Sequence, residues 1–268
     1  MFPGLIRASH PLPTTAMTVI VTLCAVSLGW RVPEVLGVAL AVLLGQLSVG
    51  WSNDAFDADL DRRSGRRTKP VVVGTVTARL LWTTAVASAV ACVVVSVVAA
   101  GFIGGTIHVI AVAAAWCYNL ALSRTAWSWL PYAIAFGAVP AFLTWGLDQS
   151  PPPAWMVVTF ALVGVSAHLA NALPDLESDR AAGVGGAAVR LGAPGTVVLG
   201  WSLLGAATTV LAATALSTSL VLASVPVVGY ATAVLVSVIR PGPQVMFRAL
   251  VAVAALDVVV LLLIARTG

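Results

Sequence analysis

The sequence predicts an all-α integral membrane protein, a bundle of nine transmembrane helices that forms a single domain over residues 1–268. Two observations lead to this class. Of the 268 residues, 60% are hydrophobic and only 9% are charged, whereas soluble domains carry about 25% charged residues. Apolar runs of about 20 residues, the length that crosses a bilayer, also recur along the chain. This composition is incompatible with a surface that mostly faces water.

The nine expected spans are separated mainly by short polar connections. They cover residues 14–30, 34–52, 78–100, 103–122, 127–146, 154–172, 195–215, 217–239 and 245–265. The first run follows Arg7 like a secretory signal, but no clear small-residue cleavage site follows it, so we interpret it as a span. Only the connections 53–77 and 173–194 are long, and both contain acidic clusters and arginines.

The positive charges predict the orientation of the chain. With nine spans and a cytoplasmic N-terminus, all lysines and arginines except Arg31 and Arg266 lie in or beside cytoplasmic connections, as the positive-inside rule requires. Both long acidic connections, and the site they form, are therefore expected on the cytoplasmic side of the cell membrane. This topology accounts for the net charge of +4, so we expect no nucleic-acid partner. The oligomeric state is left open.

Seven of the ten acidic residues fall in two nine-residue windows at the ends of apolar spans. The windows repeat one pattern, an asparagine and two aspartates spaced four residues apart. The pattern comprises Asn53, Asp57 and Asp61 in the first window, and Asn171, Asp175 and Asp179 in the second. Residues with this spacing share one face of a helix, so each window is expected to present an Asn-Asp-Asp stripe where its helix leaves the membrane.

Carboxylates gathered beside a bilayer require a compensating cation, and oxygen ligands of this kind suit Mg²⁺, which also binds phosphate oxygens. The expected metal ligands are the two stripes and Asp54. Two solvated acidic loops are the alternative, but such loops have no reason to repeat a helical period. Basic residues beside the windows, Arg66, Arg67, Lys69 and Arg180, are expected to bind a diphosphate. Cytoplasmic topology is the alternative reason for their presence.

At these residues the chain resembles the UbiA superfamily of intramembrane prenyltransferases. The first window, 53–61, matches the family motif NDxxDxxxD, and the second, 171–179, is similar to the motif DxxxD. The stretches 66–77 and 118–140 are similar to the segment after the first motif and to the central helix pair. The resemblance therefore covers most of residues 50–192.

The resemblance implies a Mg²⁺-dependent enzyme that ionises an isoprenyl diphosphate, with two aspartate-rich helix ends capping a central cavity. The implied catalytic residues are Asp54, Asp57, Asp61, Asp175 and Asp179. An acceptor then attacks the allylic cation. The acceptor cannot be identified from the sequence, but the lack of a soluble lobe favours a small, aromatic or lipidic one.

Two other functions remain alternatives. A terpene cyclase of the UbiA type would ionise and cyclise the diphosphate without an acceptor. A transporter is disfavoured, because transport sites lie near the membrane midplane and only Asp257 is deep within a span. An acid at that depth is a functional candidate, and the sequence identifies no partner for it.

Two departures from the family pattern keep the cyclase alternative open. After Gly183, where many relatives have a Lys-Arg-Thr-like triplet, this chain has Val184-Gly185-Gly186. Where many relatives have a tyrosine followed shortly by lysine, this chain has Tyr118 and then Ser123-Arg124. We expect Arg124 to replace one of the missing diphosphate contacts.

Polar and aromatic residues near the stripes are assigned to the substrate pocket. They are Asn53, Asn171, Trp116, Tyr118 and His168. His168 lies about one helical turn before Asn171, and a histidine of the structural core is the alternative. Trp116 and Tyr118 are expected either to line the pocket for the isoprenoid tail or to belong to an interfacial aromatic belt.

Overall fold

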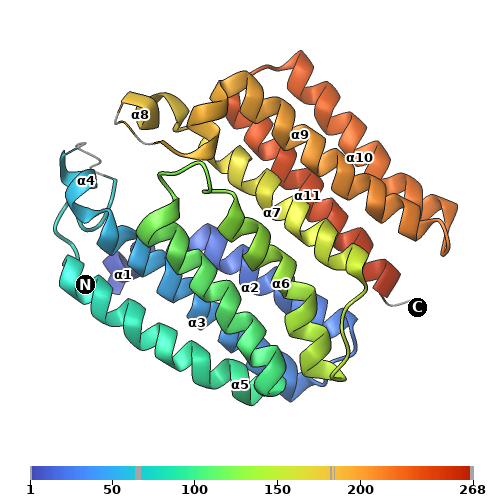
Figure 1. Ribbon diagram of the computed structural model, residues 1–268, viewed down its shortest axis with the longest axis horizontal. Helices are drawn as coiled ribbons and strands as arrows, with labels where there is room; N and C mark the ends of the chain where they lie inside the picture. Colours follow the sequence, from blue (N-terminus) through green and yellow to red (C-terminus); the bar gives the residue numbers. More distant parts are fainter. Residues whose placement is uncertain (1, 64–67, 182, 184, 266–268) are drawn as a thin grey trace. The chain divides into compact units, whose positions relative to one another are not determined.

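The computed structural model describes residues 2–63, 68–181, 183 and 185–265. Within these residues every regular element is a helix, which confirms the predicted all-α class. The chain divides into two compact units, shown together in Figure 1. Unit 1 comprises Met1–Ala121 and Ala141–Pro151, and unit 2 comprises Leu122–Pro140 and Pro152–Gly268.

Unit 1 is built around α3 (Val32–Phe56), which packs against α2 (Pro11–Ser27) and α5 (Ala78–Cys117). The short helices α1 (Phe2–Ala8) and α4 (Ala58–Arg63) also contact α3. The first acidic window therefore lies where the central helix of this unit ends.

Glycines on α3 let neighbouring segments approach closely. A Cβ atom at Gly37 would lie 2.9 Å from the Ala99 side chain, and one at Gly50 would lie 2.6 Å from the Ser9 carbonyl oxygen. Small residues at such contacts are typical of helix packing in membranes. The contact at Gly50 holds the turn between α1 and α2, which contains His10, beside the end of α3.

Helix α5 folds back on itself at Gly101. This residue has a φ of 67°, a left-handed conformation that glycine adopts readily. Ser96 Oγ lies 2.8 Å from His108 Nδ1, whereas twelve residues of straight helix would separate them by about 18 Å. α5 is therefore a helical hairpin, and its two arms correspond to the expected spans 78–100 and 103–122.

Seven helices in the described part of the chain are long and apolar enough to cross a membrane, and the bent pair α1–α2 is an eighth candidate. This total takes the α5 hairpin as one helix. The bend of 66° within the α1–α2 pair was not anticipated for the expected span 14–30. The number of nine spans and the cytoplasmic N-terminus stay predictions.

Unit 2 contains the first part of α6 together with helices α7 to α11. Their bounds are α6 Leu130–Leu147, α7 Ala154–Ala172, α8 Leu176–Ala181, α9 Ala187–Ala215, α10 Leu220–Ile239 and α11 Pro243–Ala265. α9 packs against α7, α8, α10 and α11. It begins before the expected span 195–215, and its backbone departs from helical geometry at Gly192, ahead of Pro194. The second acidic window lies in this unit, where α7 ends.

Candidate active site

The first acidic window crosses the junction of α3 and α4. Asp57 is the C-cap residue of α3, and α4 begins directly after it. The backbone N–H of Asp57 donates to the Asn53 carbonyl at 3.0 Å, and that of Asp61 donates to the Asp57 carbonyl at 2.8 Å. These bonds keep helical spacing through the junction, so the three residues of the stripe follow one face. Asp61 is buried, whereas Asn53 and Asp57 are half-buried.

The second window does not form one helix. α7 ends at Ala172, and a turn precedes α8. Pro174 explains the break, because proline lacks an N–H group and clashes with the preceding turn of a helix. The Asp179 N–H donates to the Asp175 carbonyl at 2.8 Å, so these two residues keep helical spacing. The prediction of one helix through Asn171, Asp175 and Asp179 is therefore wrong, and Asn171 stands before the turn.

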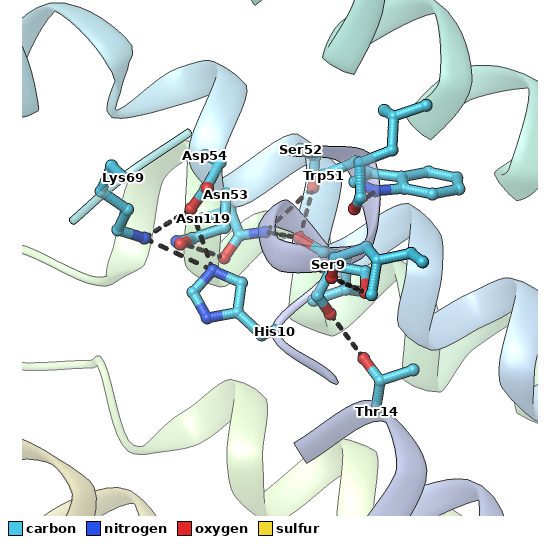
Figure 2. A network of polar contacts seen from close by, with 12 residues as sticks. Ser9, His10, Thr14, Trp51, Ser52, Asn53, Asp54, Lys69 and Asn119 are labelled. Carbon is cyan, nitrogen blue, oxygen red and sulfur yellow. Dashed lines mark hydrogen bonds and ion pairs between the residues drawn. The ribbon is translucent and has the colours of Figure 1, made fainter. Parts of the chain in front are cut away.

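Asp54 forms a buried ion pair in unit 1, as Figure 2 shows. Its carboxylate Oδ1 lies 2.5 Å from Lys69 Nζ and 2.9 Å from His10 Nε2. Asp54 is 1% exposed, and its other oxygen, Oδ2, has no hydrogen-bond partner in the described residues. The metal role predicted for Asp54 stays a prediction, since Oδ1 already serves two partners.

Asn53 is linked to Asn119, which follows the end of α5 in the π-helical turn Tyr118–Leu122. Asn53 Nδ2 donates to Asn119 Oδ1 at 3.3 Å. Asn119 Nδ2 donates in turn to the Val49 carbonyl at 2.9 Å and to Ser52 Oγ at 3.0 Å. Single π-helical turns inside α-helices frequently occur at functional sites.

The fit of these residues to a divalent cation rests on their oxygen atoms. No group of three or more His, Cys, Asp and Glu side chains in the described part of the chain is arranged to enclose a metal. Each window instead supplies two aspartates at helical spacing and one asparagine. That set suits Mg²⁺, which takes one or two carboxylates and fills its other positions with water and phosphate oxygens. The buried Oδ2 of Asp54 is a further carboxylate oxygen, and it has no hydrogen-bond partner in that same part of the structure.

The predicted diphosphate ligands differ in how the structure places them. Arg66 and Arg67 lie outside the described residues. Lys69 is half-buried in its ion pair with Asp54, whereas Arg124 and Arg180 are exposed.

The glycine-containing departure from the family pattern packs against the segment that carries Arg124. A Cβ atom at Gly185 would lie 3.0 Å from the Arg124 carbonyl oxygen, and one at Gly186 would lie 3.0 Å from the Ser123 carbonyl oxygen. Larger side chains at both positions would push the two segments apart. The glycines thus bring the connection before α9 against the backbone of Arg124.

His168 occupies a structural position in the core of unit 2. Its Nε2 lies 3.0 Å from Ser128 Oγ, which also accepts the Ala187 N–H at 3.0 Å. The His168 ring is 4% exposed and packs on Tyr132 with the ring centroids 4.6 Å apart. These contacts tie α7 to the start of α9 and favour the alternative of a core histidine.

The aromatic residues assigned to the tail pocket lie in unit 1. Trp116 donates its indole N–H to Ser48 Oγ at 3.1 Å, and its ring centroid lies 6.0 Å from that of Trp82. Tyr118 begins the π-helical turn that contains Asn119. Both side chains are half-buried, and their role in a tail pocket stays a prediction.

Unit 2 contains an apolar cavity of about 610 Å³ with Arg190 as its charged lining residue. On α7 the lining residues include Val165 and Leu169. Leu169 precedes Asn171 by two residues, which corresponds to about 200° around a helix. The cavity therefore opens on a different face of α7 from Asn171.

Three residues with defined contacts were missed in the sequence. His10 and Asn119 contact the first acidic window, and Thr208 donates a hydrogen bond of 2.8 Å to Asp257 Oδ2. Polarity within or beside an apolar run is the signal that all three share. Sequence spacing alone cannot pair them with partners, because each contact joins residues that are far apart in the sequence.

The sequence and the fold match one protein family. A model of the UbiA prenyltransferase family matches residues 14–260. No curated protein sequence matches the chain significantly.

Solved structures agree with that match in fold. A UbiA homologue from Archaeoglobus fulgidus bound to GPP and Mg²⁺ is 16% identical with a TM-score of 0.74, over 99% of this chain and 100% of that one. The apo UbiA homologue from Aeropyrum pernix K1 is 18% identical with a TM-score of 0.67, over 91% and 98%. A structure of digeranylgeranylglyceryl phosphate synthase is 14% identical with a TM-score of 0.71, over 99% and 97%. The family match covers most of the chain, and this protein therefore belongs to the UbiA prenyltransferase family.

Proposed function

We propose that the protein is a Mg²⁺-dependent intramembrane prenyltransferase that moves an isoprenyl group from its diphosphate to a small, aromatic or lipidic acceptor. The observation that carries the proposal is the repeated set of one asparagine and two aspartates where α3 and α7 end. Each set provides the few hard oxygen ligands that Mg²⁺ takes when it also binds phosphate. The Archaeoglobus fulgidus homologues bound to DMAPP or GPP with Mg²⁺ support the same substrate class.

The asparagines and aspartates of the two stripes have proposed roles as metal ligands. These are Asn53, Asp57 and Asp61 in unit 1, and Asn171, Asp175 and Asp179 in unit 2. When bound, Mg²⁺ supplies positive charge to the leaving diphosphate, which favours its departure from an allylic carbon. Both sets are needed for ionisation in this proposal.

The basic residues have proposed roles as diphosphate ligands. The ion pair with Asp54 holds Lys69 Nζ in a fixed position, which lowers the cost of ordering this long side chain when a phosphate binds. Arg124 and Arg180 are the proposed contacts in unit 2, and Arg66 and Arg67 complete the set. Guanidinium groups suit this task because they bind phosphate oxygens through two parallel hydrogen bonds.

The helices have a proposed role in protecting the allylic carbocation from water. Apolar helix walls exclude water that would capture an allylic carbocation. Trp116 and Tyr118 are proposed to line the pocket for the isoprenoid tail, and the site is proposed to face the cytoplasm.

A terpene cyclase is the second candidate, and one observation favours it. Gly185 and Gly186 pack tightly on backbone carbonyls, and they belong to the triplet where many relatives have a Lys-Arg-Thr-like sequence. A changed set of diphosphate contacts is consistent with a changed reaction. The cyclase would use the same metal ligands without an external acceptor.

Diphosphate release by the purified protein tests both candidates. Geranyl, farnesyl and geranylgeranyl diphosphates are supplied with Mg²⁺, first without and then with a panel of aromatic and lipidic acceptors, and organic products are identified by mass spectrometry. Prenyl transfer predicts release that depends on an acceptor, whereas a cyclic product without acceptor identifies the cyclase.

Single substitutions then test the metal ligands. Asp57→Ala and Asp175→Ala are expected to abolish release while the protein stays folded. Asp59→Ala is the matched control, because Asp59 lies in the first window but is 84% exposed and pairs with Arg62. Full release by both ligand variants would exclude the proposed enzyme.

A further inference from the structure

We propose that Asn119 is a positioning residue that fixes the side-chain amide of Asn53 so that its oxygen, and not its nitrogen, is presented to Mg²⁺. The inference rests on the proposed function, which makes Asn53 a metal ligand. It assigns a role to the π-helical turn Tyr118–Leu122, and Figure 2 shows the two amides together with Ser52.

The orientation of the Asn119 amide follows from its two hydrogen-bond acceptors. The Val49 carbonyl, 2.9 Å from Asn119 Nδ2, can only accept a hydrogen bond. The Ser52 hydroxyl donates its own hydrogen to the same carbonyl at 3.0 Å, so Ser52 Oγ is left to accept from Asn119. Turning the Asn119 amide by 180° would place its oxygen against the Val49 carbonyl oxygen, which cannot donate. Asn119 is 5% exposed, so solvent offers little compensation.

The orientation of the Asn53 amide follows from that of Asn119. With its NH₂ group committed to Val49 and Ser52, Asn119 presents Oδ1 to Asn53 at 3.3 Å. An amide oxygen only accepts, so Asn53 must present its own NH₂ group on this side. Asn53 Oδ1 then occupies the other branch of the amide and is the atom available to a cation.

This arrangement has a chemical consequence for the stripe. Mg²⁺ binds amide oxygens and carboxylates but not amide NH₂ groups. A freely rotating asparagine would present its NH₂ group to the metal for part of the time, which would weaken metal binding. The hydrogen bond to Asn119 prevents this rotation. The link also explains why position 53 differs from its acidic partners, since an aspartate there would place an oxygen against Asn119 Oδ1.

Metal binding by the purified protein in detergent tests the inference without an activity assay. Mn²⁺ is titrated in the absence of substrate, and bound ion is measured by electron paramagnetic resonance with Mg²⁺ as competitor. Asn119→Leu keeps a similar volume and removes the link, so its Kd for Mn²⁺ is expected to rise roughly tenfold, as for other residues that orient metal ligands. Ser52→Ala is the matched control, because Asn119 keeps its bond to the Val49 carbonyl; its Kd is expected to stay near that of the unsubstituted protein.

A double-substitution cycle separates orientation from simple support of the fold. Asn53→Asp is expected to leave Mn²⁺ binding no tighter while Asn119 is present, because the new carboxylate faces Asn119 Oδ1. The same substitution in the Asn119→Leu background is expected to tighten binding, because the opposing oxygen is gone. Additive effects, or tighter binding by Asn53→Asp alone, would overturn the inference. If Asn119→Leu does not fold, the single Asn53→Asp variant decides the question.

Different results would overturn the proposed metal site and the proposed role of Asn119. Equal Mn²⁺ binding by the unsubstituted protein and Asp57→Ala would overturn the proposed metal site, and with it the role of Asn119. Weakened binding in Asp57→Ala with unchanged binding in Asn119→Leu would overturn only the role of Asn119.

Discussion

Lys69 Nζ lies 2.5 Å from Asp54 Oδ1, and this ion pair joins the connection after α4 to the buried end of α3. The two side chains differ in burial, since Asp54 is 1% exposed and Lys69 is 21% exposed. Lys69 is the single lysine of the chain. A buried carboxylate of this kind depends on its cation, so Lys69 has a role in the fold in addition to its proposed role as a diphosphate ligand.

Removing Lys69 should cost more stability than removing the pair. Lys69→Met leaves the Asp54 carboxylate buried without its cation, and the free energy of unfolding is expected to fall by about 3–5 kcal/mol. The double variant Asp54→Asn/Lys69→Met should recover much of this loss, because no buried charge remains. Denaturant unfolding monitored by tryptophan fluorescence measures both. Equal losses of unfolding free energy in the single and double variants would show that leaving the Asp54 carboxylate without Lys69 does not itself destabilise the protein.

His10 combines an unusual backbone with a contact to Asp54. Its φ is 52°, in the left-handed region that asparagine tolerates and β-branched residues do not. His10→Asn is therefore expected to lose only the side-chain contact, whereas His10→Val loses the contact and also strains the turn before α2. The unfolding temperature should be lower for valine than for asparagine. The opposite order would argue that the turn relaxes to another conformation.

Close packing at Gly186 should make that position sensitive to a single methyl group. A Cβ atom would lie 3.0 Å from the Ser123 carbonyl oxygen, and excess volume in packed structure costs about 1–3 kcal/mol. Gly186→Ala is expected to lower both stability and diphosphate release, since it displaces the segment that carries Arg124. Gly242→Ala serves as the control, because a Cβ there meets no atom of the described residues within 4 Å. Unchanged diphosphate release in Gly186→Ala would argue against a role for Arg124 as a diphosphate ligand.

Asp257 should tolerate an isosteric amide better than an apolar side chain. Thr208 donates to Asp257 Oδ2 at 2.8 Å between α9 and α11, and an asparagine oxygen can accept the same bond. Asp257→Asn is expected to change the unfolding temperature little, whereas Asp257→Leu loses the bond and leaves the Thr208 hydroxyl without this acceptor, at a cost of about 1–3 kcal/mol. Diphosphate release that is lost in Asp257→Asn, with stability kept, would instead indicate a functional acid.

The sequence predicted the helical class and the positions of the acidic windows because both depend on local patterns. Apolar length marks the helices, and spacing of four residues marks the stripes. Proline is a signal for a helix break, and α7 does end before Pro174. The spacing of four residues between Asn171 and Asp175 instead favours an unbroken helix. The partners of Asp54, Asn53 and Asp257 lie far from them in the sequence, and no periodicity within one helix encodes them.

The positions of the two chain termini test the number of spans. The seven single helices and the bent pair α1–α2 give eight candidates, and counting the α5 hairpin as two arms makes nine. An odd number places the termini on opposite sides of the membrane, so a cytoplasmic N-terminus predicts a C-terminus outside. Green fluorescent protein fused to the C-terminus should then stay dark, and alkaline phosphatase fused there should be active, because they mature on opposite sides of a bacterial inner membrane. A fluorescent C-terminal fusion would mean an even number of spans, as when the bent pair α1–α2 does not cross the membrane.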